Sequence, residues 1–173
     1  MAAAFLSHTA ELAQHPFGRS FVDEATDAIR RAGWRAVAVA DDPYGRRPVV
    51  PCAERIASAS MWIGLIGFRY GQVVRGVPNR SHVELEHDLA QLHERPRLVC
   101  LLDDHAPALP PEAVIDRTTG ARQERFRARL RRDGAPILTF GSPGELHCRL
   151  FRWMLRAPTA PSDALWTPRS PMP

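Results

Sequence analysis

The sequence contains no lysine: all 23 of its basic residues are arginine, set against 19 aspartates and glutamates. Because Ala, Arg and Pro are abundant alongside this absence, we interpret it as codon bias and give it no functional weight. The excess positive charge is also local, since residues 117–132 hold seven arginines against Glu124 alone. The rest of the chain is slightly acidic, so the basic stripe typical of nucleic-acid-binding proteins is missing and no nucleic-acid partner is expected.

Long hydrophobic runs are also missing. No apolar stretch approaches the roughly 20 residues of a membrane-spanning helix, and the N-terminus lacks the basic and apolar segments of a secretory signal. The three cysteines, Cys52, Cys100 and Cys148, lie far apart and form no C-x-x-C pair. They indicate reduced core residues rather than disulfides or a structural zinc site. We therefore expect a cytoplasmic protein with no membrane partner and no metal.

Several motifs of well-known enzymes are absent. There is no G-x-x-x-x-G-K-[ST] loop and no G-x-G-x-x-G after the first apolar run, which excludes P-loop and dinucleotide-binding Rossmann sites. A G-x-S-x-G nucleophile elbow is also missing, which disfavours a serine hydrolase. The segment HVELEH (82–87) fits neither H-E-x-x-H nor H-x-x-E-H. We interpret it as a solvated helix face.

What the sequence does contain is an alternation of short apolar runs with longer amphipathic stretches. This pattern predicts a parallel sheet covered by helices on both faces. The predicted strands are residues 2–6, 34–40, 61–67, 97–102 and 136–140. The predicted helices are 21–32, 51–60, 81–94, 120–133 and one from near Ser142 or Gly144 to Met154. The fold class is therefore α/β, with a five-stranded parallel sheet in the order 2-1-3-4-5.

The last 17 residues differ from the rest, because five of them are proline. Such a segment buries little surface and is typical of a linker. We therefore divide the chain into a domain at 1–156 and a Pro-rich tail or linker at 157–173. A tail of this kind predicts further domains downstream in a longer polypeptide.

The helix predicted from residue 81 places one glutamate in an unusual position. On a helical projection Glu86 falls between two groups of apolar residues, whereas Glu84 shares its side with Asp88 and Gln91. Only Glu86 is therefore expected to face the sheet. A carboxylate withdrawn from water near the carboxyl ends of the strands can act as an acid, a base or a stabiliser of a developing cation. The alternative is a structural ion pair with Arg69.

The segment GFRYG (67–71) follows the third predicted strand. Its glycines permit a tight backbone path, and Arg69 and Tyr70 offer an anion clamp and a stacking surface. The alternative for Tyr70 is structural packing.

Four segments resemble a family of bacterial TIR-like domains of unknown function, which often precede STAND-type NTPase and repeat modules. They are AFLSHT, AERIASASMWIGLIGFRYG, S-x-x-E-x-E-x-x-x-A (Ser81, Glu84, Glu86, Ala90) and PRLVCLLDD. The similarity covers roughly residues 4–155. More distantly, the layout is similar to TIR domains and nucleoside 2-deoxyribosyltransferases. The resemblance implies a flavodoxin-like, three-layer fold with a functional glutamate on the helix after the third strand.

The resemblance also implies an activity. In enzymatic TIR domains this glutamate supports cleavage of the nicotinamide–ribose bond of NAD, and in the transferases it acts on an N-glycosidic bond. It therefore implies Glu86 as the catalytic residue, NAD or a related nucleotide as substrate, and no cofactor. The implied substrate-binding positions are Phe5, Ser7, His8, Asp41, Asp42, Arg69, Tyr70, Gly71, Ser81 and Glu84.

Three hypotheses follow for the function. The leading one is an NAD-consuming effector domain of a signalling or defence protein, activated when copies of it self-associate. The second is a non-catalytic module that self-associates or recruits partners through its helices and arginine-rich segment, with Arg125, Arg129 and Arg132 against an acidic partner. The third is an enzyme similar to nucleoside deoxyribosyltransferases.

Overall fold

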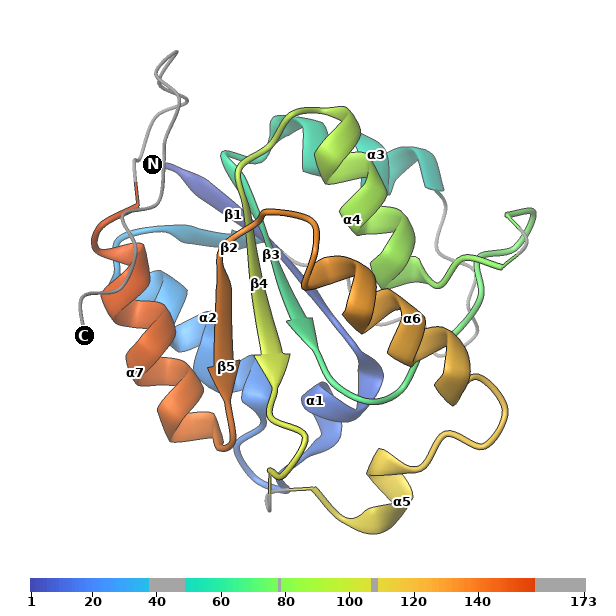
Figure 1. The fold of residues 1–173 in the computed structure, drawn as a ribbon. Coiled ribbons are helices and arrows are strands. Elements are labelled where there is room, and N and C mark those ends of the chain that lie inside the picture. The colour runs from blue at the N-terminus through green and yellow to red at the C-terminus, as the bar shows by residue number, and fades with distance from the viewer. Residues whose placement is uncertain (38–48, 78, 107–108, 158–173) are drawn as a thin grey trace.

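The computed structural model describes residues 1–37, 49–77, 79–106 and 109–157 and shows a parallel sheet between two layers of helices (Figure 1). The strand order is β2-β1-β3-β4-β5, as predicted, which is the order of flavodoxin-like folds. The strands are β1 (Ala3–His8), β2 (Arg35–Val37), β3 (Met61–Ile66), β4 (Arg97–Leu102) and β5 (Ile137–Phe140). The helices are α1 (Ala10–Gln14), α2 (Phe21–Arg31), α3 (Val49–Ser58), α4 (His82–Leu92), α5 (Pro111–Val114), α6 (Gly120–Leu130) and α7 (Pro143–Met154).

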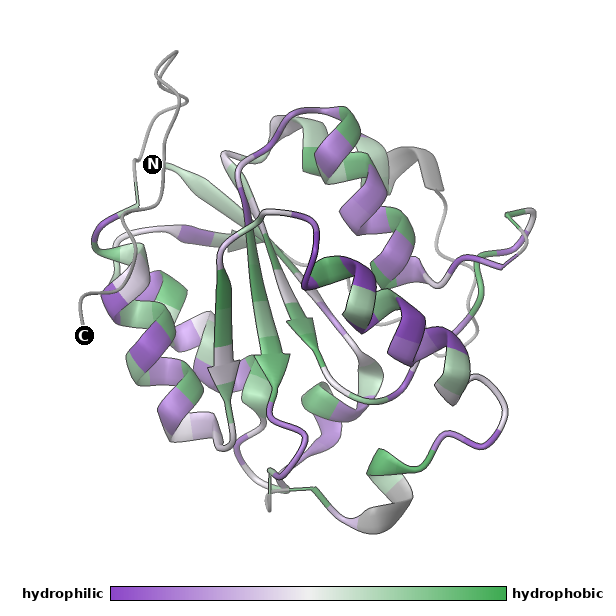
Figure 2. Cartoon of the chain, in the orientation of Figure 1, coloured by the Kyte–Doolittle hydropathy of each residue, from purple (hydrophilic) through white to green (hydrophobic). Residues whose placement is uncertain are grey.

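Each face of the sheet has its own hydrophobic core. Helices α1, α2 and α7 cover one face, where Leu6 and Ile63 pack against Phe21 of α2 and Leu150 of α7. Helices α3, α4 and α6 cover the other face. Figure 2 shows that the central strands are hydrophobic, whereas the helices alternate between hydrophobic and hydrophilic residues. Successive side chains of a strand point to opposite faces of the sheet and so enter the two cores in turn. Every residue of the central strand β3 is therefore buried.

Helix boundaries follow from local capping. Ser81 accepts a hydrogen bond from the backbone N–H of Glu84 and begins α4, as the sequence predicts. Ser142 begins α7 in the same way, with Pro143 in the first turn. Gly33 follows α2 with a φ of +82°, a conformation that favours glycine.

The structure differs from the predicted elements in a few places. Strand β1 extends to His8, two residues beyond its apolar run, because the pairing with β3 continues there. Helices α1 and α5 were not predicted, since four or five residues are too few to show a helical period. The second strand is described only over Arg35–Val37, and the predicted tail beyond residue 157 lies outside the described residues.

Two further expectations concern cysteines and membranes. Cys52 and Cys100 are buried and none of the three cysteines forms a disulfide within the described residues, but Cys148 is exposed, so its prediction as a core residue is wrong. It lies on the outer side of α7, whose inner side is made by Leu146, Leu150 and Met154. Within the described ranges, no helix has the length and apolar character needed to cross a bilayer.

Candidate functional site

A cleft of about 650 Å³ opens at the carboxyl ends of β1 and β3. The strand order reverses between these two strands, and ligands bind at such switch points in open α/β sheets. The cleft is lined by His8, Thr9, Ala10, Gln14, Arg69, Tyr70, Gly71, Gln72, His82, Val83, Asp116, Thr118 and Thr119. Four of the residues predicted to bind substrate are therefore brought together here: His8, Arg69, Tyr70 and Gly71.

The loop after β3 is held from one side by a carboxylate that sequence reasoning missed. Glu11 is buried in α1, and its Oε1 accepts hydrogen bonds from the backbone N–H groups of Phe68 (2.7 Å) and Arg69 (3.0 Å). Burial raises the pKa of Glu11, although these hydrogen bonds and that of Thr9 act to lower it. A Cβ at Gly67 would lie 2.1 Å from Oε1, so only glycine fits this close approach.

Helix α6 holds the same loop from the other side. The guanidinium of Arg127 is buried and donates to the carbonyl oxygens of Ile66 (3.1 Å), Gly67 (3.0 Å) and Leu102 (2.7 Å). The side-chain amide of Gln123 also donates to Gly67, at 2.8 Å. Arg127 is therefore part of the protein interior, whereas Arg125 on the same helix is exposed. Strands β3 and β4 end with carbonyl groups that need donors, and a guanidinium supplies several at once.

Glu86 lies on α4, with 3% of its surface exposed, as the prediction that it faces inward requires. The Ser7 hydroxyl donates to its Oε2, and the Cys52 thiol lies 3.5 Å from its Oε1. Within the described ranges no ion pair joins it to Arg69, whose side chain is exposed at the cleft, so the alternative of a structural pair with Arg69 is not found. Neither Ser7 nor Glu86 is among the residues that line the cleft, but Val83, one turn before Glu86 on α4, does line it.

Glu84 is also buried, which contradicts the prediction that only Glu86 faces inward. It is 6% exposed, and its carboxylate accepts a hydrogen bond from the Tyr70 hydroxyl. Arg80 lies 3.0 Å and Arg129 3.2 Å from its Oε1. Helix α6 supplies Arg129 and thereby covers the side of α4 that periodicity assigned to solvent.

The interpretation of residues 82–87 as a solvated face is wrong for the same reason. His87 is buried, and its Nε2 lies 3.0 Å from a carboxylate oxygen of Asp133, just beyond α6. Leu92, by contrast, is 73% exposed. The buried side of α4 is therefore centred on Val83 and Ala90.

Tyr70 supports the site mainly as a structural group. Its ring is buried, its hydroxyl accepts from the backbone N–H of Ser81 at 3.2 Å, and it lies 2.9 Å from the carbonyl oxygen of Asn79. Burial raises the pKa of Tyr70, and the hydrogen bond with Glu84 raises it further, so the phenol stays neutral. It ties the loop after β3 to the start of α4.

Within the described residues, the remaining positions that were predicted to bind substrate are not found in the lining of the cleft. Phe5 is fully buried in the core under α3 and α4 and is not among the residues that line the cleft. Ser81 is buried as the N-cap of α4. Asp41 and Asp42 lie outside the described residues.

Asp116 is a cleft residue that sequence reasoning missed. Its carboxylate accepts hydrogen bonds from the Thr119 hydroxyl (2.6 Å) and from the backbone N–H groups of Thr119 (2.7 Å) and Tyr70 (3.3 Å). Burial acts to raise the pKa of Asp116, but these hydrogen bonds outweigh it and the pKa is lowered. The sequence DRTTG before α6 is a turn signal of the kind that precedes helices, and it could have identified this anion.

One group of side chains in the described residues has the spacing of metal ligands. Glu24, Asp27 and His147 offer ligand atoms within 4.8 Å of one another, on α2 and α7. Arg19 lies 2.6 Å from Glu24, and Arg31 lies 2.8 Å from Asp27. These arginines already neutralise the carboxylates, and the group lies on the opposite layer from Glu86.

Several solved structures are similar to this chain, and three of them are described here. A CMP N-glycosidase from Clostridium botulinum, BcmB, aligns with a TM-score of 0.51 at 12% identity, covering 87% of this chain and 98% of that one. A diflavin flavoprotein A3 from Nostoc sp. aligns at 0.48 and 9% identity, covering 90% and 94%. A flavodoxin-like domain from Synechococcus sp. aligns at 0.42 and 14%, covering 89% and 99%.

At these identities the likeness concerns the fold. No curated protein matches the sequence significantly. A family model described as "Domain of unknown function (DUF4062)" matches residues 19–154, which is most of the chain. The chain therefore belongs to the DUF4062 family.

Proposed function

We propose that this chain cleaves the N-glycosidic bond of a nucleotide, with Glu86 as the catalytic carboxylate. The observation that carries the proposal is the position of Glu86, which is buried on α4 one turn beyond the cleft-lining Val83 and has Ser7 and Cys52 among its partners. The Clostridium protein of similar fold is described as an N-glycosidase of CMP, which supports this class of bond. The choice of NAD as the first substrate to test comes from the resemblance to TIR domains.

Cleavage of this N-glycosidic bond requires mainly one carboxylate close to the ribose. In NAD the bond between ribose C1′ and the pyridinium nitrogen breaks, its electron pair leaves with neutral nicotinamide, and positive charge develops on the ribose. A carboxylate held in place by donors such as the Ser7 hydroxyl stabilises that charge or holds a ribose hydroxyl. Water then adds to C1′ and releases its proton to solvent.

Other cleft residues have roles in substrate binding under this proposal. The exposed guanidinium of Arg69 binds a phosphate group of the nucleotide, as a planar donor of several N–H groups can. Gly71, with a φ of +77°, lets the backbone pass close to the ligand. His8 contacts the substrate from the end of β1, and the proposal keeps Asp41 and Asp42 as contacts from the second loop.

The biological setting is part of the same proposal. We propose a TIR-like effector domain whose copies self-associate to become active, with STAND-type or repeat domains downstream in a longer polypeptide. The resemblance of the four segments quoted above is its basis.

A non-catalytic adaptor is the competing proposal. The observation that favours it is the exposed Arg125 on α6, which has no ion pair with any described residue. Arg129, which we also predicted at this surface, is instead paired with Glu84 and Asp88. The adaptor would self-associate or bind an acidic partner with the catalytic cleft unused.

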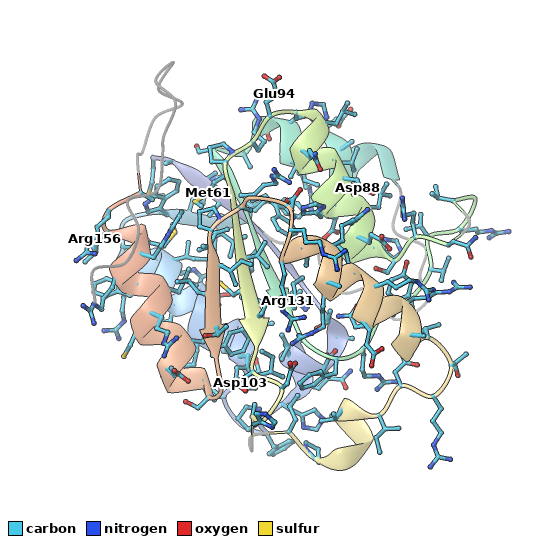
Figure 3. All side chains as sticks on the ribbon, in the orientation of Figure 1. Met61, Asp88, Glu94, Asp103, Arg131 and Arg156 are labelled. Atoms are coloured by element: carbon cyan, nitrogen blue, oxygen red, sulfur yellow. The ribbon has the colours of Figure 1, made fainter. Side chains whose placement is uncertain are left out.

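The experiment compares wild type, Glu86→Gln and Glu94→Gln. Glu94→Gln makes the same chemical change just beyond the C-terminal end of α4, where Figure 3 shows Glu94 away from Asp103 and the carboxyl ends of the strands. Each full chain is incubated with NAD, CMP and other nucleotides, free and on an oligomerising scaffold, and released base is measured by chromatography. A free base is added in parallel, because a transferase would attach it to the sugar.

We expect base release by wild type and Glu94→Gln and its loss in Glu86→Gln. Equal release by all three chains would remove Glu86 from the mechanism. Self-association without base release in any format would favour the adaptor.

A further inference from the structure

A second pocket lies between α4 and α6 and shares only Tyr70 with the residues that line the cleft. It has a volume of about 500 Å³, within the range of small-molecule sites. Its lining residues are Tyr70, Asn79, Arg80, Glu84, Arg122, Arg125, Phe126 and Arg129. Four of these eight side chains are arginine, and Figure 2 shows hydrophilic residues along both helices.

The positive charge of this arginine pocket is only partly neutralised. Arg80 lies 3.0 Å from Glu84 and 3.3 Å from Asp88, and Arg129 lies 3.2 Å and 2.9 Å from the same two residues. Two arginines therefore share two carboxylates. Arg122 and Arg125 form no ion pair with any residue in the described ranges, so two positive charges remain without a counterion from this part of the chain.

The arginines of α6 are also arranged on one side of the helix. Residues 122, 125 and 129 follow at spacings of three and four, which places them in one row. The Arg129 guanidinium lies 5.2 Å from the centre of the Phe126 ring, which supports it. Its Nε–H is buried and has no hydrogen-bond partner among the described residues. The pocket thus holds both unpaired charge and an unused donor.

Phosphate groups fit this arrangement better than other anions do. A guanidinium binds a phosphate through two parallel N–H donors, and a concave surface lined by one sign of charge concentrates the opposite ion. Side chains one turn apart on a helix are separated by about 5–6 Å, which suits two linked phosphate groups. The pocket is concave and Phe126 is among its lining residues, which suits a small ligand. An acidic protein would instead bind a flat, open surface.

We propose that this arginine pocket binds a diphosphate group, either as the free ion or as part of a nucleotide, through Arg122 and Arg125 supported by Arg129. Glu86 is not among the residues that line this pocket, and the inference does not depend on the proposed glycosidase activity.

Isothermal titration calorimetry tests the proposal on the full chain. The probes are inorganic diphosphate, ADP, adenosine and a polyglutamate peptide. The test variant is Arg122→Gln/Arg125→Gln, whose side chains are not needed for any ion pair described. The matched control is Arg30→Gln/Arg152→Gln, which removes the same charge from exposed positions on the opposite layer. Circular dichroism and thermal unfolding verify that each chain is folded.

We expect diphosphate to bind wild type and the control with dissociation constants within twofold of each other, and the test variant at least tenfold more weakly. ADP bound more tightly than diphosphate, with the same loss, would identify a nucleotide as the source; equal affinities would identify the diphosphate ion. Adenosine should show no dependence on these arginines.

Three outcomes would overturn the proposal. The first is the absence of diphosphate and ADP binding to wild type. The second is an equal loss of affinity in the test and control variants, which would indicate nonspecific attraction. The third is polyglutamate binding that needs Arg122 and Arg125 while the phosphates do not bind, which would assign the surface to an acidic protein partner.

Discussion

Glu84 and Glu86 lie two residues apart on α4, and both are almost fully buried, yet their surroundings differ. Glu84 contacts a phenol and two guanidinium groups, so its charge is neutralised within the protein. Glu86 has a hydroxyl and a thiol among its partners and lies one turn from Val83, which lines the cleft. Burial of a carboxylate therefore does not by itself mark a catalytic site. The partners decide whether it acts in structure or in chemistry.

The largest expected effect is on activity, and it separates the two residues most clearly. Glu86→Gln should lower base release by roughly 100-fold or more, because an amide cannot stabilise a developing cation as a carboxylate does. Glu84→Gln should lower it less than tenfold. Rates of base release for both variants, with unfolding curves to verify the fold, make the measurement. Equal losses would mean that Glu84 shares the catalytic role.

For the free energy of unfolding, we expect Glu84→Gln to have the larger effect and Glu86→Gln the smaller one. Glu84→Gln leaves Arg80 and Arg129 without one of their carboxylates, and we expect a loss of about 1–3 kcal/mol in the free energy of unfolding. Glu86→Gln keeps an oxygen acceptor for Ser7 and should cost about 1 kcal/mol or less. Urea denaturation measures both. A larger loss for Glu86→Gln would make it the structural member of the pair.

Tyr70→Phe tests how much the hydrogen bond between Tyr70 and Glu84 contributes to stability. The substitution removes the hydroxyl that donates to Glu84 and accepts from the backbone of Ser81. We expect a loss of about 1 kcal/mol in unfolding free energy, because the ring still fills its place in the core. The loss should shrink when Glu84 is already glutamine, in a double-mutant cycle. Additive losses would show that the two side chains are not coupled.

Glu11 extends the comparison to a third buried carboxylate through its pH dependence. Its pKa is raised in the folded chain, so its protonated form stabilises the fold at pH below 4.5, its ordinary value. That contribution is lost as the pH rises through the folded-state pKa. Glu11→Gln has no such titration, so its unfolding free energy should improve relative to wild type as the pH rises from 4.5. Denaturation across a pH series checks this, and a constant difference would contradict it.

The sequence was sufficient for the sheet and for one side of the site. Apolar runs and turn residues predicted the five strands, and Ser81 and Ser142 marked the helix starts. The strand order came from the α/β fold class. The inward position of Glu86 followed from the apolar residues on its own helix. Its catalytic role stays a proposal. These features depend on local patterns, which a single sequence displays.

What was missed depends on contacts between distant segments. Glu84 is buried because α6 brings Arg129 against it, and Arg127 is buried because two strands end beside it. A helical projection treats each helix alone and so assigns such charged residues to solvent. Glu11 was missed because its partners are backbone amides of a loop far along the chain.

The clamp on the loop after β3 has a consequence for how this fold can acquire new specificities. Glu11 holds the amides of Phe68 and Arg69, while Gln123 and Arg127 hold the carbonyl of Gly67. A backbone tied from both sides keeps its path when the side chains it presents are exchanged. Substitution at the exposed position 69 can therefore retune ligand choice without remodelling the loop, which makes this position a natural starting point for laboratory evolution.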